Sequence, residues 1–140
     1  MELQLEFTTD RFKLTGPLPD DNNAGNQFYG EDLAKWLCET LPAWKLDHMD
    51  EDWGWLVFTT KDYMPADQRH SICVYAYPAE NQGASDHGHW MLSILCEYKV
   101  KWLGLLKRWK HGPYHSDLAK EVIAGLESLG IQDVKQTEIN

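Results

Sequence analysis

The sequence predicts an α+β fold, a two-layer sandwich in which an antiparallel sheet of four to six strands carries two main helices on one face. Alternating apolar and polar residues, typical of strands, recur along the chain, and two other segments carry apolar residues at helical spacing. Short links between consecutive strands favour antiparallel pairing. The 140 residues, of which 43% are hydrophobic, show no internal repeat, so we expect one domain over residues 1–140.

The first predicted strand lies at the N-terminus, where apolar and polar residues alternate over residues 2–8. Residues 15–25 are rich in Gly, Pro, Asp and Asn and predict a loop. Asn26 is a suitable cap for a helix that runs to about Leu41. The apolar stripe of this helix consists of Leu33, Trp36, Leu37 and Leu41.

The middle of the chain predicts a run of strands separated by turns. Residues 50–52 and 61–67 are turn-like, and residues 81–86 predict a loop. The predicted strands cover residues 44–49, 53–60, 69–77 and 89–98, and an extension of the last one to residue 102 stays open.

The C-terminal third contains one ambiguous segment and one clear helix. Residues 102–110 carry apolar residues at helical spacing but follow a strand directly, so helix and strand both stay open. Ser116 is expected to cap a helix that Gly130 ends, with a final edge strand within residues 131–139. The inner face of this helix consists of Leu118, Val122, Leu126 and Leu129.

The charge is strongly acidic and unevenly distributed. The chain has 22 acidic and 13 basic residues, a net charge of −9; residues 1–98 hold 17 acidic and 6 basic residues, and residues 99–140 hold 5 and 7. This balance disfavours nucleic acid and anionic membranes and favours a basic partner, although acidity also serves solubility alone. The C-terminal basic run is expected to pair with the acidic half, internally or across a homodimer. It consists of Lys99, Lys101, Lys107, Arg108 and Lys110.

Cysteine usage and the absence of a long apolar run indicate a cytoplasmic protein. Cys38, Cys73 and Cys96 fit neither a disulfide framework nor a Cys-x-x-Cys metal site, and we expect them to be buried, reduced thiols. The N-terminus does not resemble a secretion signal, and no segment has the apolar length of a membrane span.

An aromatic and acidic segment is the main candidate for binding. Asp50-Glu51-Asp52 directly precedes Trp53-Gly54-Trp55, and the two tryptophans would share one face of a strand. They could belong to the core, or they could bind arginine or lysine of a partner beside the carboxylates. The candidate partner-binding residues are Asp50, Glu51, Asp52 and Trp55, followed by Asp20 and Asp21.

Signals for catalysis or for a metal are weak. His87 and His89 lie two residues apart and are weak metal candidates, with His70, His111 or His115 as a third candidate ligand, because no helical His-x-x-x-His and no Cys-x-x-Cys accompanies them. The chain has no Gly-x-Ser-x-Gly motif and no phosphate-binding glycine motif. We therefore predict no catalytic residues and no cofactor.

Two segments resemble a group of small uncharacterised bacterial proteins. One is Asn26-Gln27-Phe28-Tyr29-Gly30, which matches an Asn-x-Phe-Tyr-Gly helix opening, and the other is Glu51-Asp52-Trp53-Gly54-Trp55. The resemblance implies organisation and supplies no activity. The profile of a small, acidic, single-domain protein is also similar to that of immunity proteins, which neutralise toxin domains that are often basic.

These observations favour a non-enzymatic, protein-binding module, in particular an immunity-type or inhibitor protein that neutralises a basic partner through an acidic surface bearing tryptophan. The alternatives are a domain that binds a small ligand or a metal, and an enzyme whose site leaves no sequence motif.

Overall fold

The computed structural model describes residues 1–14, 28–76, 88–104 and 106–140, and in them two helices and one seven-stranded sheet. The predicted α+β fold is confirmed, with seven strands where four to six were expected. In chain order the elements are β1 (Glu2–Thr9), α1 (Glu31–Thr40), a 3₁₀ turn (Pro42–Trp44), β2 (Leu46–Glu51), β3 (Gly54–Thr59), β4 (Gln68–Ala76), β5 (Gly88–Trp102), β6 (Leu106–Gly112), α2 (Ser116–Ser128) and β7 (Lys135–Ile139).

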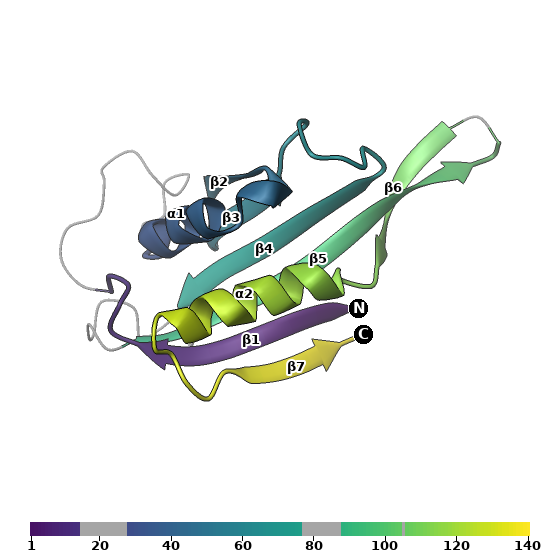
Figure 1. The fold of residues 1–140 in the computed structure, drawn as a ribbon. Coiled ribbons are helices and arrows are strands. Elements are labelled where there is room, and N and C mark those ends of the chain that lie inside the picture. The colour runs from purple at the N-terminus through teal and green to yellow at the C-terminus, as the bar shows by residue number, and fades with distance from the viewer. Residues whose placement is uncertain (15–27, 77–87, 105) are drawn as a thin grey trace.

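The sheet is antiparallel throughout and is built around the long strand β5. The strand order is β2-β3-β4-β5-β1-β7, and β6 also pairs with β5. One edge of β5 pairs with β4, while the other edge pairs first with β1, as far as Ile94, and then with β6, from Cys96. The strand β5 thus continues from the main sheet into a two-stranded hairpin (Figure 1).

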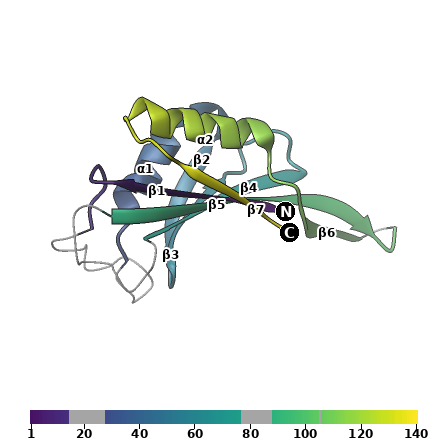
Figure 2. The ribbon, with the colours of Figure 1, turned by 90° about the horizontal axis from the view of Figure 1, so that it is seen from below.

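Both helices lie on the same face of the sheet, as predicted (Figure 2). Strand residues that face the helices are buried at every second position, as in β1, where Leu3, Leu5 and Phe7 alternate with polar residues. Together with the inner faces of both helices they form one core. Its fully buried members include Leu5, Leu33, Leu37, Ile72, Trp90, Leu92, Ile94, Leu118 and Leu126.

The helix ends differ from the prediction in detail. The first helix begins at Glu31, after Gly30, and no side chain caps it; Asn26 lies outside the described residues. The sequence predicts Ser116 as the cap of the second helix, but Ser116 is the first residue of that helix, and the capping group is the His115 ring, whose Nδ1 accepts the Asp117 backbone N–H at 3.2 Å.

Residues 102–110, which the sequence left open, belong to the hairpin. Leu103 and Gly104 adopt positive φ angles of 52° and 75°, which produce a tight turn between β5 and β6. The apolar residues at helical spacing in this segment therefore do not form a helix. We call residues 99–110 the arm, because this hairpin projects beyond the main sheet (Figures 1 and 2).

Candidate partner-binding surface

The predicted acidic residues lie together at the end of the β2–β3 hairpin. Glu51 is the last residue of β2 and pairs with Gly54, so Asp52 and Trp53 form the turn. Asp52 is exposed, and Asp50 and Glu51 are half-buried. Between residues 46 and 60 the sequence has four acidic residues and no lysine or arginine. Asp20 and Asp21, the other acidic candidates, lie outside the described residues.

Gly54 holds this acidic hairpin tightly against the neighbouring strand. A Cβ atom at residue 54 would lie 2.6 Å from the carbonyl oxygen of Val74, which is closer than any side chain tolerates. The glycine is thus needed for the close approach of β3 to β4 at the hairpin end.

The two tryptophans of this segment point to opposite sides, so the prediction that they share a face is wrong. Because Trp53 occupies the turn, the alternation of β3 begins only at Gly54. Trp55 is 3% exposed and belongs to the core. Trp53 is 38% exposed, and its ring meets Tyr75 edge to face with the centroids 6.1 Å apart. The exposed aromatic side chain beside the acidic cluster is therefore that of Trp53, where Trp55 was expected.

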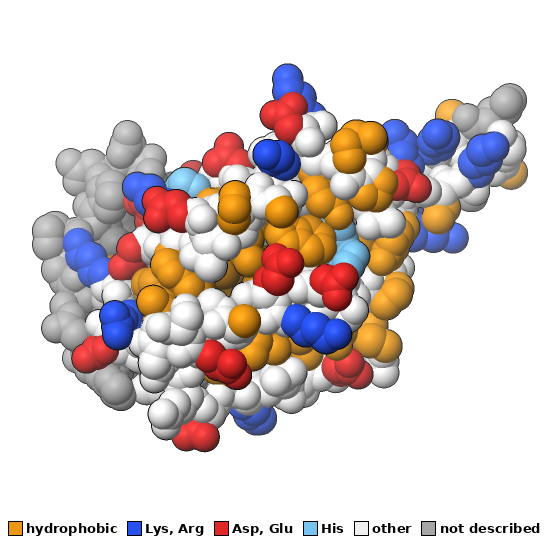
Figure 3. Space-filling model, in the orientation of Figure 1, with side chains coloured by type: hydrophobic (Ala, Val, Ile, Leu, Met, Phe, Trp, Pro, Cys, Tyr) orange, Lys and Arg blue, Asp and Glu red, His pale blue; other side chains and the backbone are white. Residues whose placement is uncertain are grey.

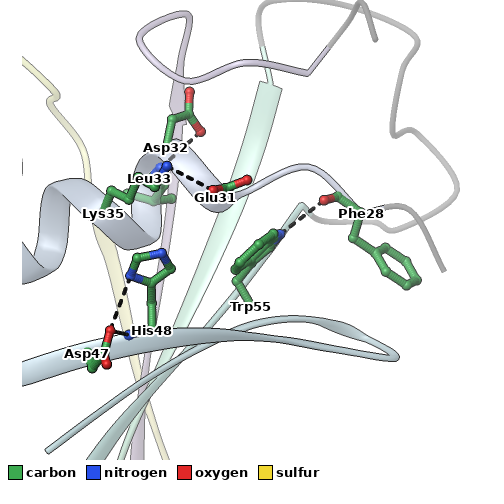
Figure 4. Close-up of polar contacts among 8 residues, drawn as sticks. All are labelled: Phe28, Glu31, Asp32, Leu33, Lys35, Asp47, His48 and Trp55. Atoms are coloured by element: carbon green, nitrogen blue, oxygen red, sulfur yellow. Dashed lines mark hydrogen bonds and ion pairs between the residues drawn. The ribbon is translucent and has the colours of Figure 1, made fainter. Parts of the chain in front are cut away.

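Trp55 joins the two segments that stand out in the sequence, residues 26–30 and 51–55, through a contact with Phe28 (Figure 4). Its Nε1 donates to the carbonyl oxygen of Phe28 at 3.0 Å. A Cβ atom at Gly30 would lie 3.1 Å from Trp55 Cδ1, and Gly30 also has a φ of +131°. Glycine at residue 30 thus permits the close contact between the start of the helix and β3.

A shallow hollow of about 280 Å³ lies over this junction. Its walls combine aromatic and charged side chains, including the ion pair between Lys35 Nζ and Glu31 Oε1 at 2.8 Å. Asp32 fixes the start of the helix here, because its carboxylate accepts the backbone N–H groups of Lys13 at 2.8 Å and Leu33 at 2.9 Å. The residues that line the hollow are Lys13, Phe28, Tyr29, Gly30, Glu31, Asp32, Lys35 and Trp55.

The face of the sheet opposite the helices, which we call the open face, is covered by neither helix (Figure 2). Cross-strand partners share a face, so the register from Met49 through Leu56 and Cys73 to Ser93 defines one row on it. Apolar or aromatic side chains, mostly partly exposed, gather on the β2–β5 part of this face, whereas β1 presents Glu2, Gln4, Glu6 and Thr8 on it. The apolar or aromatic side chains of the open face include Met49, Trp53, Leu56, Phe58, Cys73, Tyr75, Leu95 and Ile139.

Glutamates border the open face and affect its titrating groups. Burial raises the pKa of Tyr75 to about 12, and Cys73, Glu2 and Glu6 add to the shift. Burial likewise raises the pKa of Cys73 to about 12, with contributions from Glu2 and Glu51. Cys73 is therefore an unreactive thiol on the open face. Of the three cysteines expected to be buried, Cys96 is buried, and Cys38 and Cys73 are only partly buried.

The sequence reasoning missed a buried histidine between the helices and β4. His70 is fully buried; its Nε2 lies 3.2 Å from the Tyr63 hydroxyl, and its Nδ1 has no hydrogen-bond partner among the described residues. Burial, with a contribution from His115, lowers the pKa of His70 to about 4. The Trp44 ring stacks on Tyr63 and donates from Nε1 to Glu121 at 2.6 Å. A signal for this position existed, because His70 falls on the same alternation as Ile72 and Val74.

Neither the histidines nor the other described residues form a metal site. His89 is exposed at the start of β5, and His87 lies outside the described residues. No group of three His, Cys, Asp or Glu residues in the described ranges is arranged to hold a metal ion.

The basic run of the sequence lies on the arm, whose Lys and Arg side chains gather at the upper right of Figure 3. The acidic hairpin end lies near the other end of β5, because Trp55 pairs with Val74 and Val74 with Leu92. Of the residues of the basic run, Lys99, Lys101, Lys107, Arg108 and Lys110 are exposed. At the base of the arm the Arg69 guanidinium lies 4.3 Å from the centre of the Trp109 ring and donates from Nε to Glu97 at 2.9 Å.

The fold and this surface define an α+β protein with segregated acidic and basic regions and a sheet face that neither helix covers. No family model, curated protein or solved structure matches the chain. Among the described helices, neither has the length and apolar character to cross a membrane.

Proposed function

We propose that this protein binds a basic protein partner through the acidic end of the β2–β3 hairpin, as an inhibitor or immunity-type protein. The observation that carries the proposal is the combination of three adjacent carboxylates with the exposed Trp53 ring. A carboxylate cluster attracts lysine and arginine side chains over long range, and an aromatic ring beside it adds cation–π contacts.

The surroundings of the cluster support the same function. Met49 is 44% exposed and lies beside Glu51 in β2, so an apolar contact is available next to the charges. Interfaces generally combine such an apolar anchor with a polar rim. The free cysteines of the chain are compatible with a reducing compartment, and we place the protein's action in the cytoplasm.

The test compares wild-type protein with the variant Glu51→Lys, Asp52→Lys as bait in a cell lysate over a salt gradient. We expect a basic protein to be retained by the wild type below about 100 mM salt and to be lost from the variant. The retained protein is then purified, and its Kd for the variant should be at least about tenfold higher than for the wild type.

The matched control is Asp62→Lys, Glu127→Lys, which changes the net charge equally at two exposed positions away from the hairpin. Equal loss of binding in both variants would mean that only net charge matters, and unchanged binding in the hairpin variant would refute this surface.

A small-ligand site at the hollow between Phe28 and Trp55 is the second candidate. Its aromatic walls and charges of both signs suit a zwitterionic aromatic molecule, such as a free aromatic amino acid. Titration with free tryptophan and tyrosine, followed by NMR, should shift the resonances of Lys35 and Trp55 first. Equal shifts over the whole surface, or none, would eliminate this candidate.

A further inference from the structure

The open face carries opposite charges at its two ends. Side chains in β5 alternate between faces, so Lys99 and Lys101 share the open side with Leu95. The register pairs Lys101 with Lys107 and Lys99 with Trp109, which brings these β6 residues to the same side. The acidic end of the open face holds Glu6 of β1, which pairs with Met91 and forms an ion pair with Lys135 at 3.6 Å, and Glu51 of β2. Glu2 lies on the same face but closer to the arm, because its neighbour Leu3 pairs with Ile94.

At the basic end, two lysines face each other without a carboxylate partner among the described residues. Lys101 and Lys107 are exposed and lie directly opposite each other, and like charges in this position destabilise a strand pair. Neither ammonium group forms an ion pair with another part of the chain that the structure describes. The arrangement therefore favours an acidic surface placed over the arm.

Between these ends, the open face has the composition of an interface core. Its partly exposed apolar side chains, among them Leu56, Phe58 and Tyr75, form adjacent rows on β3 and β4. In two-layer proteins a face of this kind is commonly polar and solvated, so a continuous apolar area indicates a contact.

We propose that a second copy of this chain covers the open face, with the arm of each copy lying over the acidic end of the other. The chain itself supplies both complementary parts, a basic arm and an apolar surface edged by Glu2, Glu6 and Glu51.

A two-fold axis satisfies this arrangement. The axis would lie between the two facing sheets and cross β5 at a right angle near Cys96, where β6 takes over from β1 as the neighbour of β5. Rotation about this axis places the arm of each copy over the main sheet of the other. Two sheets packed face to face lie about 10 Å apart, and such an isologous contact closes as a dimer.

The dimer contact differs from the contact proposed for the basic partner. Asp50 pairs with the core residue Trp55 and thus lies on the other side of the sheet, and Asp52 is in the turn at the hairpin end. Glu51 and Trp53 border both contacts, but the dimer test changes only Glu2, Glu6 and lysines of the arm, so its outcome is read without the basic partner.

The experiment is sedimentation equilibrium of the full chain from about 1 to 100 μM at about 50 mM salt. We expect the wild type to approach about 32 kDa, twice the mass of one chain. The arm variant Lys101→Glu, Lys107→Glu and the face variant Glu2→Lys, Glu6→Lys should each dimerise at least about tenfold more weakly. An equimolar mixture of the two variants should regain the dimer, because each arm then meets a face of opposite charge.

The matched control is Lys110→Glu, Lys120→Glu, which changes the net charge as much as the arm variant. Lys110 pairs with Tyr98 on the other side of the arm, and Lys120 lies on α2, so this variant should remain dimeric. A monomeric wild type over the whole range would overturn the proposal, and binding to phosphatidylserine vesicles under the same conditions would then assign the arm to lipid. Failure of the mixture to associate, with both variants folded by circular dichroism, would also overturn it.

Discussion

Gly30 illustrates how one residue links the two segments that stand out in the sequence. Its φ of +131° is rarely adopted by other residues, and the nearest Trp55 atom leaves little room for a side chain. We predict that Gly30→Ala lowers the free energy of unfolding by about 1–3 kcal/mol, measured by urea denaturation.

Gly130→Ala provides the control for the Gly30 prediction. Gly130 also has a positive φ, +79°, but no atom lies within 4 Å of the position of its Cβ. This variant should lose only the backbone contribution, about 1 kcal/mol. Equal losses at the two glycines would show that the contact with Trp55 adds nothing.

His70 predicts a pH dependence of stability. Because the pKa of its folded form, about 4, lies below the ordinary 6.5, the unfolded chain takes up the proton first as the pH falls. His70 should not affect stability above pH 6.5, and roughly 2 kcal/mol should be lost between pH 6.5 and 4.

Urea denaturation at pH 7.5, 5.5 and 4.5, with wild type beside His70→Gln, tests this prediction. Glutamine retains hydrogen-bonding groups toward Tyr63 but does not titrate. The variant should therefore lose less stability than the wild type over the same pH range. Parallel pH profiles would show that other groups cause the decrease.

At the scale of elements, the arm depends on contacts at its base. The Arg69 guanidinium lies over the Trp109 ring and also binds Glu97, so one side chain connects β4, β5 and β6. We predict that Trp109→Ala accelerates amide hydrogen exchange about two- to fivefold in residues 99–110 and leaves β1 unchanged, because a cation–π contact contributes about 0.5–1 kcal/mol.

Lys107→Ala is the control for this prediction. Lys107 lies on the same side of the arm as Trp109, and its replacement by alanine removes no aromatic ring, so amide exchange in the arm should change little. If Trp109→Ala also accelerated amide exchange in β1, the ring would stabilise the main sheet as well as the arm, and the prediction would be wrong.

An element was predicted correctly where its apolar pattern and the turn or cap residues beside it indicated the same structure. The strands with clear alternation, such as β1 and β4, and the helix α2 were located to within a few residues. Residues 102–110 were ambiguous because apolar side chains at helical spacing also occur by chance on a two-stranded hairpin. Pairing with β5 and the turn at Leu103 and Gly104 decide for the strand, and this turn has none of the Asn-Gly or Asp-Gly pairs that mark a hairpin in a sequence.

The candidate site was predicted only in part. The acidic residues of the β2–β3 hairpin do lie together, because they are adjacent in sequence. The exposure of Trp53 and the burial of Trp55 depended on which two residues formed the turn, and a shift of one position exchanges the two faces. The open face required the complete strand order, which the sequence does not reveal.

At the scale of the whole molecule, one continuous core predicts one cooperative unfolding transition. Trp44, Trp55 and Trp90 report on this core by fluorescence, whereas far-ultraviolet circular dichroism reports on the helices and the sheet. The two transitions in urea should coincide within error. Separate midpoints would show that part of the sheet unfolds independently of the core.

The shared strand β5 has a consequence for how this chain tolerates insertions. No loop interrupts β5 between the main sheet and the arm, so the alternation of its side chains between the two faces continues from one into the other. One residue inserted after Leu95 would turn Lys99 and Lys101 toward the helix side and bring Val100 to the other, while an insertion of two residues would lengthen the arm and preserve its orientation. Length variants of this protein that retain the arm's chemistry should thus differ by even numbers of residues in β5.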